Sequence, residues 1–129
     1  MSEFNILVAD DEPGIRHFLR RGLRLEGYDV LEADSGMAAV KMAGESKPNL
    51  VILDWMMPGL DGPETLRQIR ATGATMPIIF LTGRDGTSED GLALGAADYF
   101  SKPVSFAQLV ARLHTLLPSM NLTRQNNLI

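Results

Sequence analysis

Five short apolar runs recur along the chain, and segments with the spacing of amphipathic helices separate them. Each run has the length of a strand, and three are apolar almost throughout, as expected of strands covered on both faces. The runs are NILVA from Asn5, YDVLEA from Tyr28, NLVIL from Asn49, PIIFL from Pro77 and ADYF from Ala97. Strand and helix therefore alternate five times, which predicts an α/β fold with a parallel sheet and helices on both of its faces.

The first helix is predicted between two residues that suit the ends of helices. Pro13 stands near its start, and Gly27 stands where a C-terminal glycine would close it. Ile15, Leu19 and Leu23 recur on one face of this segment, which is therefore expected to pack on the sheet.

Four further helices are expected, at about residues 35–45, 62–71, 87–94 and 105–117. Asp61 is placed to cap the helix from residue 62, and Ser105 and Gln108 have the spacing of a capping box. The helix at 87–94 is weak, since glycines lie in or beside it and an interior glycine costs ~1 kcal/mol relative to alanine. It is either a short helix held by tertiary contacts alone or a segment kept labile because it must move.

The length of 129 residues suits one domain and is too short for two full ones. Residues 1–118 are expected to form that domain, because the periodicity stops after Pro118. Residues 119–129 are interpreted as a tail or the start of a linker. No effector domain fits in them, so the protein either acts alone by docking or is one piece of a longer chain.

Composition narrows the possible environments and partners. The net charge of -4 argues weakly against direct nucleic-acid binding. With no cysteine there is no disulfide scaffold or thiolate metal site, which fits a reducing compartment. No segment resembles a signal peptide or reaches the ~20 apolar residues of a membrane-spanning helix. A cytoplasmic protein that does not contact the membrane is therefore expected.

Polar side chains collect at the carboxyl ends of the predicted strands, where open parallel sheets bind ligands. Asp10 and Asp11 follow the first strand, Asp54 the third, Thr82 the fourth and Lys102 the fifth. Converging carboxylates raise each other's pKa unless a cation shares them, and oxygen ligands suit a hard cation such as Mg²⁺. Lysine and threonine can contact phosphate oxygens, and aspartate can carry an acyl phosphate, so these residues form a candidate phosphoryl site.

Four motifs stand in the order and at the distances of one known family. They are DDE after the first strand, DWMMPGLDG at the third, LTG at the fourth and KP at the fifth. Over roughly residues 4 to 117 the chain resembles the CheY-like receiver (REC) domain of two-component response regulators. The resemblance implies a doubly wound (βα)5 flavodoxin-like three-layer sandwich with parallel sheet order 2-1-3-4-5.

The same resemblance implies a metal site and a phosphoacceptor. Asp54 would accept a phosphoryl group from the phosphohistidine of a sensor histidine kinase or a histidine phosphotransfer protein in a phosphorelay. Asp11 and Asp54 would bind Mg²⁺ or Mn²⁺ through their carboxylates, Met56 through its backbone carbonyl, and Asp10 through a bound water.

A switch is implied as well. Lys102 would contact the phosphoryl group, Thr82 would turn inward to hydrogen-bond it, and the ring of Tyr99 would follow. Affinity for a downstream protein target or effector domain would then change at the face of the fourth helix, fifth strand and fifth helix. The bond before Pro103 is expected to be cis. Such a protein is a phosphoacceptor that assists its own phosphorylation and dephosphorylation, and not a dedicated enzyme.

Other interpretations of these residues stay open at this point. Asp10 and Asp11 could simply cap the first helix, and Lys102 taken alone could be an ordinary surface residue. The fold could also serve as a binding module that signals without phosphate. A metal-dependent hydrolase is a further class, but the sequence shows no second set of substrate-binding residues.

Two groups of basic residues bear on partners. Arg16, Arg20 and Arg24 recur at i, i+4 and i+8 on the first helix, beside Arg21, and form either a solvated face or a docking face for an acidic partner.

Winged-helix regulators dimerise through a salt-bridge network, of which Arg112 matches one basic member. Asp90, Ala97 and Ser119 depart from that network, so a dimer of that type is not expected.

Overall fold

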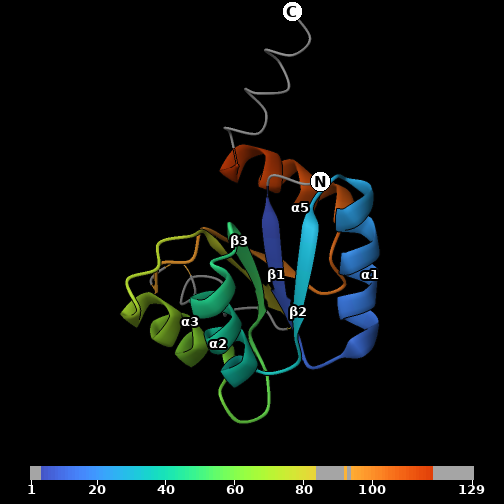
Figure 1. The fold of residues 1–129 in the computed structure, drawn as a ribbon. Coiled ribbons are helices and arrows are strands. Elements are labelled where there is room, and N and C mark those ends of the chain that lie inside the picture. The colour runs from blue at the N-terminus through green and yellow to red at the C-terminus, as the bar shows by residue number, and fades with distance from the viewer. Residues whose placement is uncertain (1–3, 84–91, 93, 118–129) are drawn as a thin grey trace, which may run out of the picture.

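The fold is a single parallel sheet with helices on both sides, seen in a computed structural model that describes residues 4–83, 92 and 94–117 (Figure 1). The sheet order is β2-β1-β3-β4-β5, and every neighbouring pair is parallel. The strands are β1 (Asn5–Ala9), β2 (Asp29–Ala33), β3 (Leu50–Asp54), β4 (Ile78–Thr82) and β5 (Asp98–Ser101). The predicted doubly wound fold and its strand order are confirmed.

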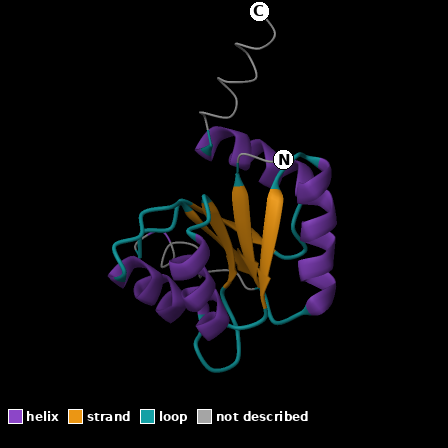
Figure 2. Ribbon diagram, in the orientation of Figure 1, coloured by secondary structure: helices purple, strands orange, loops and turns teal. Residues whose placement is uncertain are grey.

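Four helices in the described part of the chain form the two outer layers (Figure 2). They are α1 (Pro13–Leu25), α2 (Gly36–Ser46), α3 (Gly62–Ala71) and α5 (Phe106–Leu116). Alternation along β1 divides the core, because Ile6 and Val8 join the cluster beneath α1 and α5, whereas Leu7 and Ala9 join the one beneath α2 and α3. The sheet is thus covered on both faces, which explains its nearly continuous apolar strands.

Helix ends follow the residues that predicted them. Gly27 adopts φ 99° after α1, and the N–H groups of Gly27 and Tyr28 donate to the carbonyls of Arg24 and Leu23, which is a Schellman motif. The side chains of Ser35, Asp61 and Ser105 cap α2, α3 and α5. Each accepts a hydrogen bond from the backbone N–H three residues further along the chain. None of the helices described is long and apolar enough to cross a membrane.

Several sequence predictions lie outside the described residues. The helix expected at 87–94 falls there except for Leu92, which is helical, and Leu94. The predicted tail, residues 119–129, and the domain boundary at Pro118 also fall there, so these remain predictions.

Candidate functional site

The candidate residues occupy one edge of the sheet. Asp54 and Thr82 are the last residues of β3 and β4, whereas the sequence analysis placed each of them directly after its strand. Asp10 directly follows β1, and Lys102 directly follows β5. Since parallel strands end at a common edge, four separate motifs meet there.

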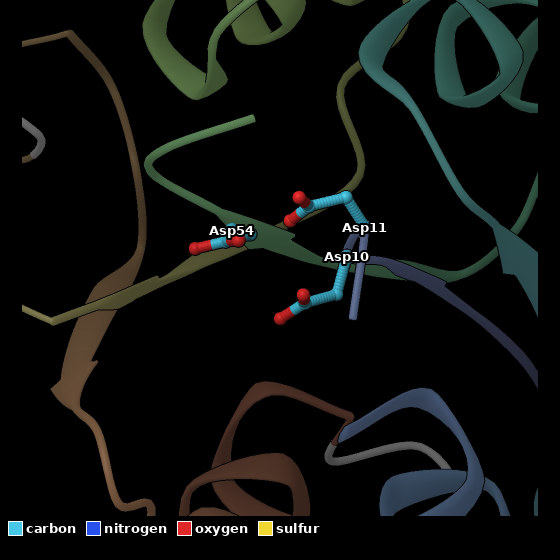
Figure 3. A group of neighbouring side chains, drawn as sticks. All are labelled: Asp10, Asp11 and Asp54. Carbon is cyan, nitrogen blue, oxygen red and sulfur yellow. The ribbon is translucent and has the colours of Figure 1, made fainter. Parts of the chain in front are cut away.

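Three carboxylates form a cluster at this edge. Asp10, Asp11 and Asp54 each offer an oxygen that lies within 4.8 Å of the others. Figure 3 shows the three side chains directed to the same side of the strand ends. Asp10 and Asp54 are buried, whereas Asp11 is exposed. A set of hard oxygen donors without histidine or cysteine fits Mg²⁺ or Mn²⁺.

Lys102 joins the two buried carboxylates. Its Nζ lies 3.1 Å from Oδ2 of Asp10 and 3.1 Å from Oδ1 of Asp54, with Oε1 of Glu12 at 3.6 Å. Burial lowers the pKa of Lys102, but the charges of Asp54 and Asp10 outweigh burial and raise that pKa above its ordinary value. One ammonium therefore faces two buried carboxylates, and the site keeps an excess negative charge that a cation could neutralise.

The pKa of Asp54 is raised from 3.8 to about 6. Burial of the carboxylate is the largest cause and the charge of Asp10 the second, while Lys102 and the N–H of Met56 oppose both. That N–H donates to Oδ1 of Asp54 over 3.4 Å. At neutral pH Asp54 is thus mainly ionised, although its surroundings disfavour the ionised form. A bound cation would stabilise that form.

The loop after β3 is held against the strands. The N–H of Trp55 donates to the carbonyl of Leu81, and the N–H of Gly62 donates to the carbonyl of Trp55. A Cβ on Gly62 would lie 2.5 Å from the carbonyl oxygen of Asp54, so only glycine fits here without a shift of the backbone. The sequence analysis placed residue 62 at the start of a helix and missed this close approach.

A cleft of about 290 Å³ opens beside Asp54. It is lined by Glu12, Asp54, Met56, Gly83 and Lys102. A Cβ on Gly83 would meet no atom within 4 Å, so the absence of a side chain there leaves open space next to the carboxylate.

The two residues of the implied switch differ in exposure. Thr82 is buried at 2% exposure, whereas Tyr99 is 36% exposed on β5. β5 pairs with β4, so Tyr99 lies beside Phe80 and Ser101 beside Thr82. The Lys102–Pro103 peptide bond is cis.

Neither Asp10 nor Asp11 is the N-cap residue of α1, so the capping alternative does not hold for them in the described structure. The N-cap residue of α1 is Glu12, and its side chain makes no capping hydrogen bond. Oδ1 of Asp10 instead accepts from the N–H of Glu12 over 2.9 Å, while Oδ2 faces Lys102. Both oxygens of Asp10 are therefore used within the site.

The arginines of α1 are not simply a solvated face. Nε of Arg16 lies 3.3 Å from Oε1 of Glu32, and Nη1 of Arg20 lies 3.5 Å from Oε2 of the same residue, on β2. The sequence analysis missed this pairing. The available signal was an acidic residue, Glu32, between the apolar residues Leu31 and Ala33 of a predicted strand.

Arg112 also has partners within the chain. Its Nε lies 2.8 Å from Oδ2 of Asp98, and its Nη2 donates to the carbonyl of Ala97 over 3.2 Å. Asp90 and Ser119, the other positions compared with the winged-helix dimer network, lie outside the described residues.

The strand order and the acid cluster at the carboxyl edge define an α/β protein of the CheY-like, flavodoxin-like class. The family model described as "Response regulator receiver domain" matches residues 6–114. The chain therefore belongs to the response regulator receiver domain family, whose members serve two-component systems.

Curated relatives agree with this family. The response regulator MprA of Mycobacterium leprae is 46% identical over 114 residues, which cover 87% of this chain and 50% of the relative. MprA of Mycobacterium bovis BCG is also 46% identical over 114 residues, with the same coverage. The chain thus spans about half the length of the curated relatives it matches.

Solved structures agree as well. The receiver domain of the Francisella response regulator 1452 superposes with a TM-score of 0.86 at 32% identity, covering 92% of this chain and 99% of that one. The chemotaxis protein CheY4 of Vibrio cholerae superposes with a TM-score of 0.82 at 28% identity, covering 88% and 98%.

Proposed function

We propose that this receiver accepts a phosphoryl group on Asp54, in a reaction that needs Mg²⁺ or Mn²⁺, and then changes its affinity for a partner. One observation carries the proposal: Asp10 and Asp54 lie at equal distances of 3.1 Å from Lys102, with Asp11 in the same cluster. Asp54 also lines a cleft and has a pKa raised by burial, and a carboxylate with a perturbed pKa in a cleft is typical of functional sites.

The metal would be held by the carboxylates of Asp11 and Asp54 and the backbone carbonyl of Met56, with Asp10 acting through water. When bound, it would neutralise negative charge on the carboxylates and on the incoming phosphate. The donor set fits such an ion because it contains only oxygen atoms and carries excess negative charge.

The residues of the chain supply the nucleophile and further charge stabilisation. A carboxylate oxygen of Asp54 would form the bond to phosphorus as the bond from phosphorus to a histidine nitrogen of the partner breaks. The electron pair of that bond stays on the imidazole. Lys102 lies 3.1 Å from the same carboxylate and would stabilise the charge on the phosphoryl oxygens.

The phosphorylated state would be read through Thr82 and Tyr99. Thr82 ends β4 within the same edge, and Tyr99 is partly exposed on the adjacent strand. A hydroxyl that turns toward the phosphoryl group would vacate space for the aromatic ring and change the surface of β5 and α5. The proposed partners are a histidine kinase or phosphotransfer protein upstream and a protein target or effector domain downstream.

The protein is proposed to be a switch and not a dedicated enzyme, although it assists gain and loss of its own phosphate. A dimer of the winged-helix type is not proposed, because Asp90, Ala97 and Ser119 depart from the salt-bridge network of that dimer. The cytoplasm, where kinases of this type present phosphohistidine, is the proposed location.

The test is phosphorylation by a small donor. The protein is incubated with acetyl phosphate and Mg²⁺, and its intact mass is followed beside an Asp54→Asn variant and an Asp34→Asn variant, which removes an exposed carboxylate. A phosphate-sized increase that requires Mg²⁺, persists in Asp34→Asn and disappears in Asp54→Asn is expected.

Each other outcome has a defined meaning. An increase that persists in Asp54→Asn would assign the phosphate to another residue. If neither acetyl phosphate nor a phosphorylated histidine phosphotransfer domain modified the protein, the proposal would fail and a phosphate-independent binding module would take its place.

A further inference from the structure

Arg16 makes two kinds of contact with different parts of the fold. Its Nη1 donates to the backbone carbonyl of Asp10 over 2.7 Å, and its Nε lies 3.3 Å from Oε1 of Glu32. The side chain is only 16% exposed, although it lies on the arginine-rich helix α1. Arginine suits this position because its planar fork can satisfy two acceptors at once.

The contact with Asp10 acts on the peptide that joins the two adjacent acids. On one side, the N–H of Asp10 donates to the carbonyl of Ala33 over 3.1 Å. On the other, the carbonyl of Asp10 accepts from Arg16. Because that carbonyl belongs to the Asp10–Asp11 peptide plane, Arg16 helps to set the direction in which both side chains leave the backbone.

Glu32 holds the guanidinium in place. Its two carboxylate oxygens face Arg16 and Arg20 separately, at 3.3 and 3.5 Å, and its side chain is 23% exposed. Glu32 lies on β2 in register with Val8 of β1, so its position is fixed by the sheet. The chain of contacts runs from β2 through Glu32 and Arg16 to the acidic pair.

We propose that Arg16 is a positioning residue for divalent-metal binding, through its hydrogen bond to the carbonyl of Asp10. The inference rests on the proposed function, in which Asp10 and Asp11 take part in the metal site. It assigns to Arg16 an internal role in place of the docking role considered from the sequence.

Charge and geometry act in opposite directions at this residue. A positive charge beside the carboxylates repels a divalent cation, so removing the charge of Arg16 would by itself tighten metal binding. Loss of the hydrogen bond would release the peptide and weaken binding, as loss of outer-shell partners does. The sign of the change therefore distinguishes positioning from electrostatics.

The test is a Mg²⁺ titration of the whole chain, followed by isothermal calorimetry and by the fluorescence of Trp55, the single tryptophan, which adjoins Asp54. Arg16→Met is expected to weaken Mg²⁺ binding about tenfold. Arg16→Lys, which keeps the charge but not the two-acceptor fork, is expected to weaken it by less. Arg24→Met, which removes an exposed charge from the same helix, is the matched control and is expected to leave the affinity unchanged.

A readout without metal supports the titration. The amide of Asp11 belongs to the peptide that Arg16 holds, so its NMR signal in metal-free protein should move in Arg16→Lys and stay in Arg24→Met. Thermal unfolding without metal establishes that each variant is folded, and Arg16→Lys carries the test if Arg16→Met does not fold.

The outcomes separate this inference from the proposed function. Wild-type protein that binds Mg²⁺, together with Arg16 variants that bind it equally or more tightly, would overturn the positioning role alone. Wild-type protein that binds no Mg²⁺ would overturn the proposed metal site and this role with it. A docking role for Arg16 predicts unchanged Mg²⁺ affinity and slower transfer only from a protein donor, and that result would also overturn the inference.

Discussion

The two ends of the sheet carry cavities of different size and different chemistry. At the carboxyl end, the cleft beside Asp54 has a volume of about 290 Å³ and contains buried charge. At the amino end, a larger cavity of about 670 Å³ lies between the C-terminal turns of α2 and α3 and the strands that follow them. Of the described residues that line it, only Lys47 carries a charge, and it is exposed.

The candidate site is therefore distinguished by its buried charged residues and not by the volume of its cavity. Asp10 and Asp54 share the single ammonium of Lys102, and the pKa of Asp54 stays raised, so ionised Asp54 weighs against stability in the isolated fold. At the amino end, both turns use left-handed backbone: Gly73 takes up φ 90° at no steric cost, whereas Lys47 adopts φ 47° after α2. The carboxyl end of the sheet carries the reactive side chains, whereas the amino end carries turns that connect helices to strands.

The largest expected effect comes from adding one methyl group at the carboxyl end. In Gly62→Ala, the new Cβ would lie 2.5 Å from the carbonyl oxygen of Asp54 and 2.8 Å from Cα of Trp55, both backbone atoms. The loop must move, which is expected to cost about 2–3 kcal/mol of unfolding free energy. Urea denaturation measures the loss.

The same substitution at a roomier glycine is the control. Gly83→Ala, at the same end of the sheet, adds a Cβ that meets nothing within 4 Å and should change the free energy of unfolding little. Equal effects of the two variants would show that the close approach at Gly62 is not what limits this loop.

Lys102→Met is expected to slow phosphorylation by acetyl phosphate about tenfold or more, because one charged donor to the developing phosphoryl charge is lost. It should also raise the pKa of Asp54 further, since Lys102 lowers that pKa at present. The measurement is the rate of mass increase at saturating Mg²⁺ between pH 6 and 8.

Lys47→Met removes the same charge at the other end of the sheet and is the matched control. Its rate should equal that of the wild type. A similar loss in both variants would point to the net charge of the protein instead of the contact between Lys102 and Asp54.

The third effect concerns stability and pH. Folding raises the pKa of Asp54 from 3.8 to about 6, so its protonated form favours the folded state. That contribution is present below about pH 3.8 and is lost as the pH rises through 6. Asp54→Asn should therefore be more stable than wild type by about 1–3 kcal/mol at pH 7.5 without metal, since each pKa unit corresponds to about 1.4 kcal/mol.

Thermal unfolding across pH 4 to 8 measures this advantage, which should grow up to about pH 6 and then level off. Mg²⁺ should stabilise the wild type more than the variant. Asp34→Asn, at an exposed carboxylate, is the control. A constant difference between Asp54→Asn and wild type across this range would mean that burial does not shift the titration of Asp54.

Most of the fold, and the residues that form the candidate site, could be predicted from sequence patterns. The strands begin and end within about one residue of their predicted bounds, because apolar runs mark them. Gly27 and Asp61 likewise mark the end of α1 and the start of α3 by local chemistry. Asp10, Asp54 and Lys102 could be grouped because they follow strands, and parallel strands share an edge. The strand order itself came from family resemblance, since apolar runs do not specify their neighbours.

The partners of individual side chains could not be predicted in the same way. Glu32 reaches Arg16 only because β2 is the edge strand beside β1, and Gly62 meets Asp54 only because the loop after β3 folds back. Both contacts depend on sheet order and loop path, which lie beyond local periodicity. The arginine stripe was therefore considered as a surface, although two of its members have partners on β2.

The smallest expected effect tests the amino end of the sheet. Gly44 lies in α2 and lines the larger cavity, and a Cβ there would meet nothing within 4 Å. Gly44→Ala should stabilise the protein by about 0.5–1 kcal/mol, because alanine loses less backbone freedom in a helix. The rate of phosphorylation should not change.

Gly36→Ala in the same helix is the control. Its Cβ would lie 2.5 Å from the carbonyl oxygen of Leu60, so this substitution should destabilise the protein. A urea midpoint that rises for Gly44→Ala without a change in phosphorylation rate would mean that this end is free to vary. A fall in that rate would instead tie the larger cavity to the chemistry at the opposite edge.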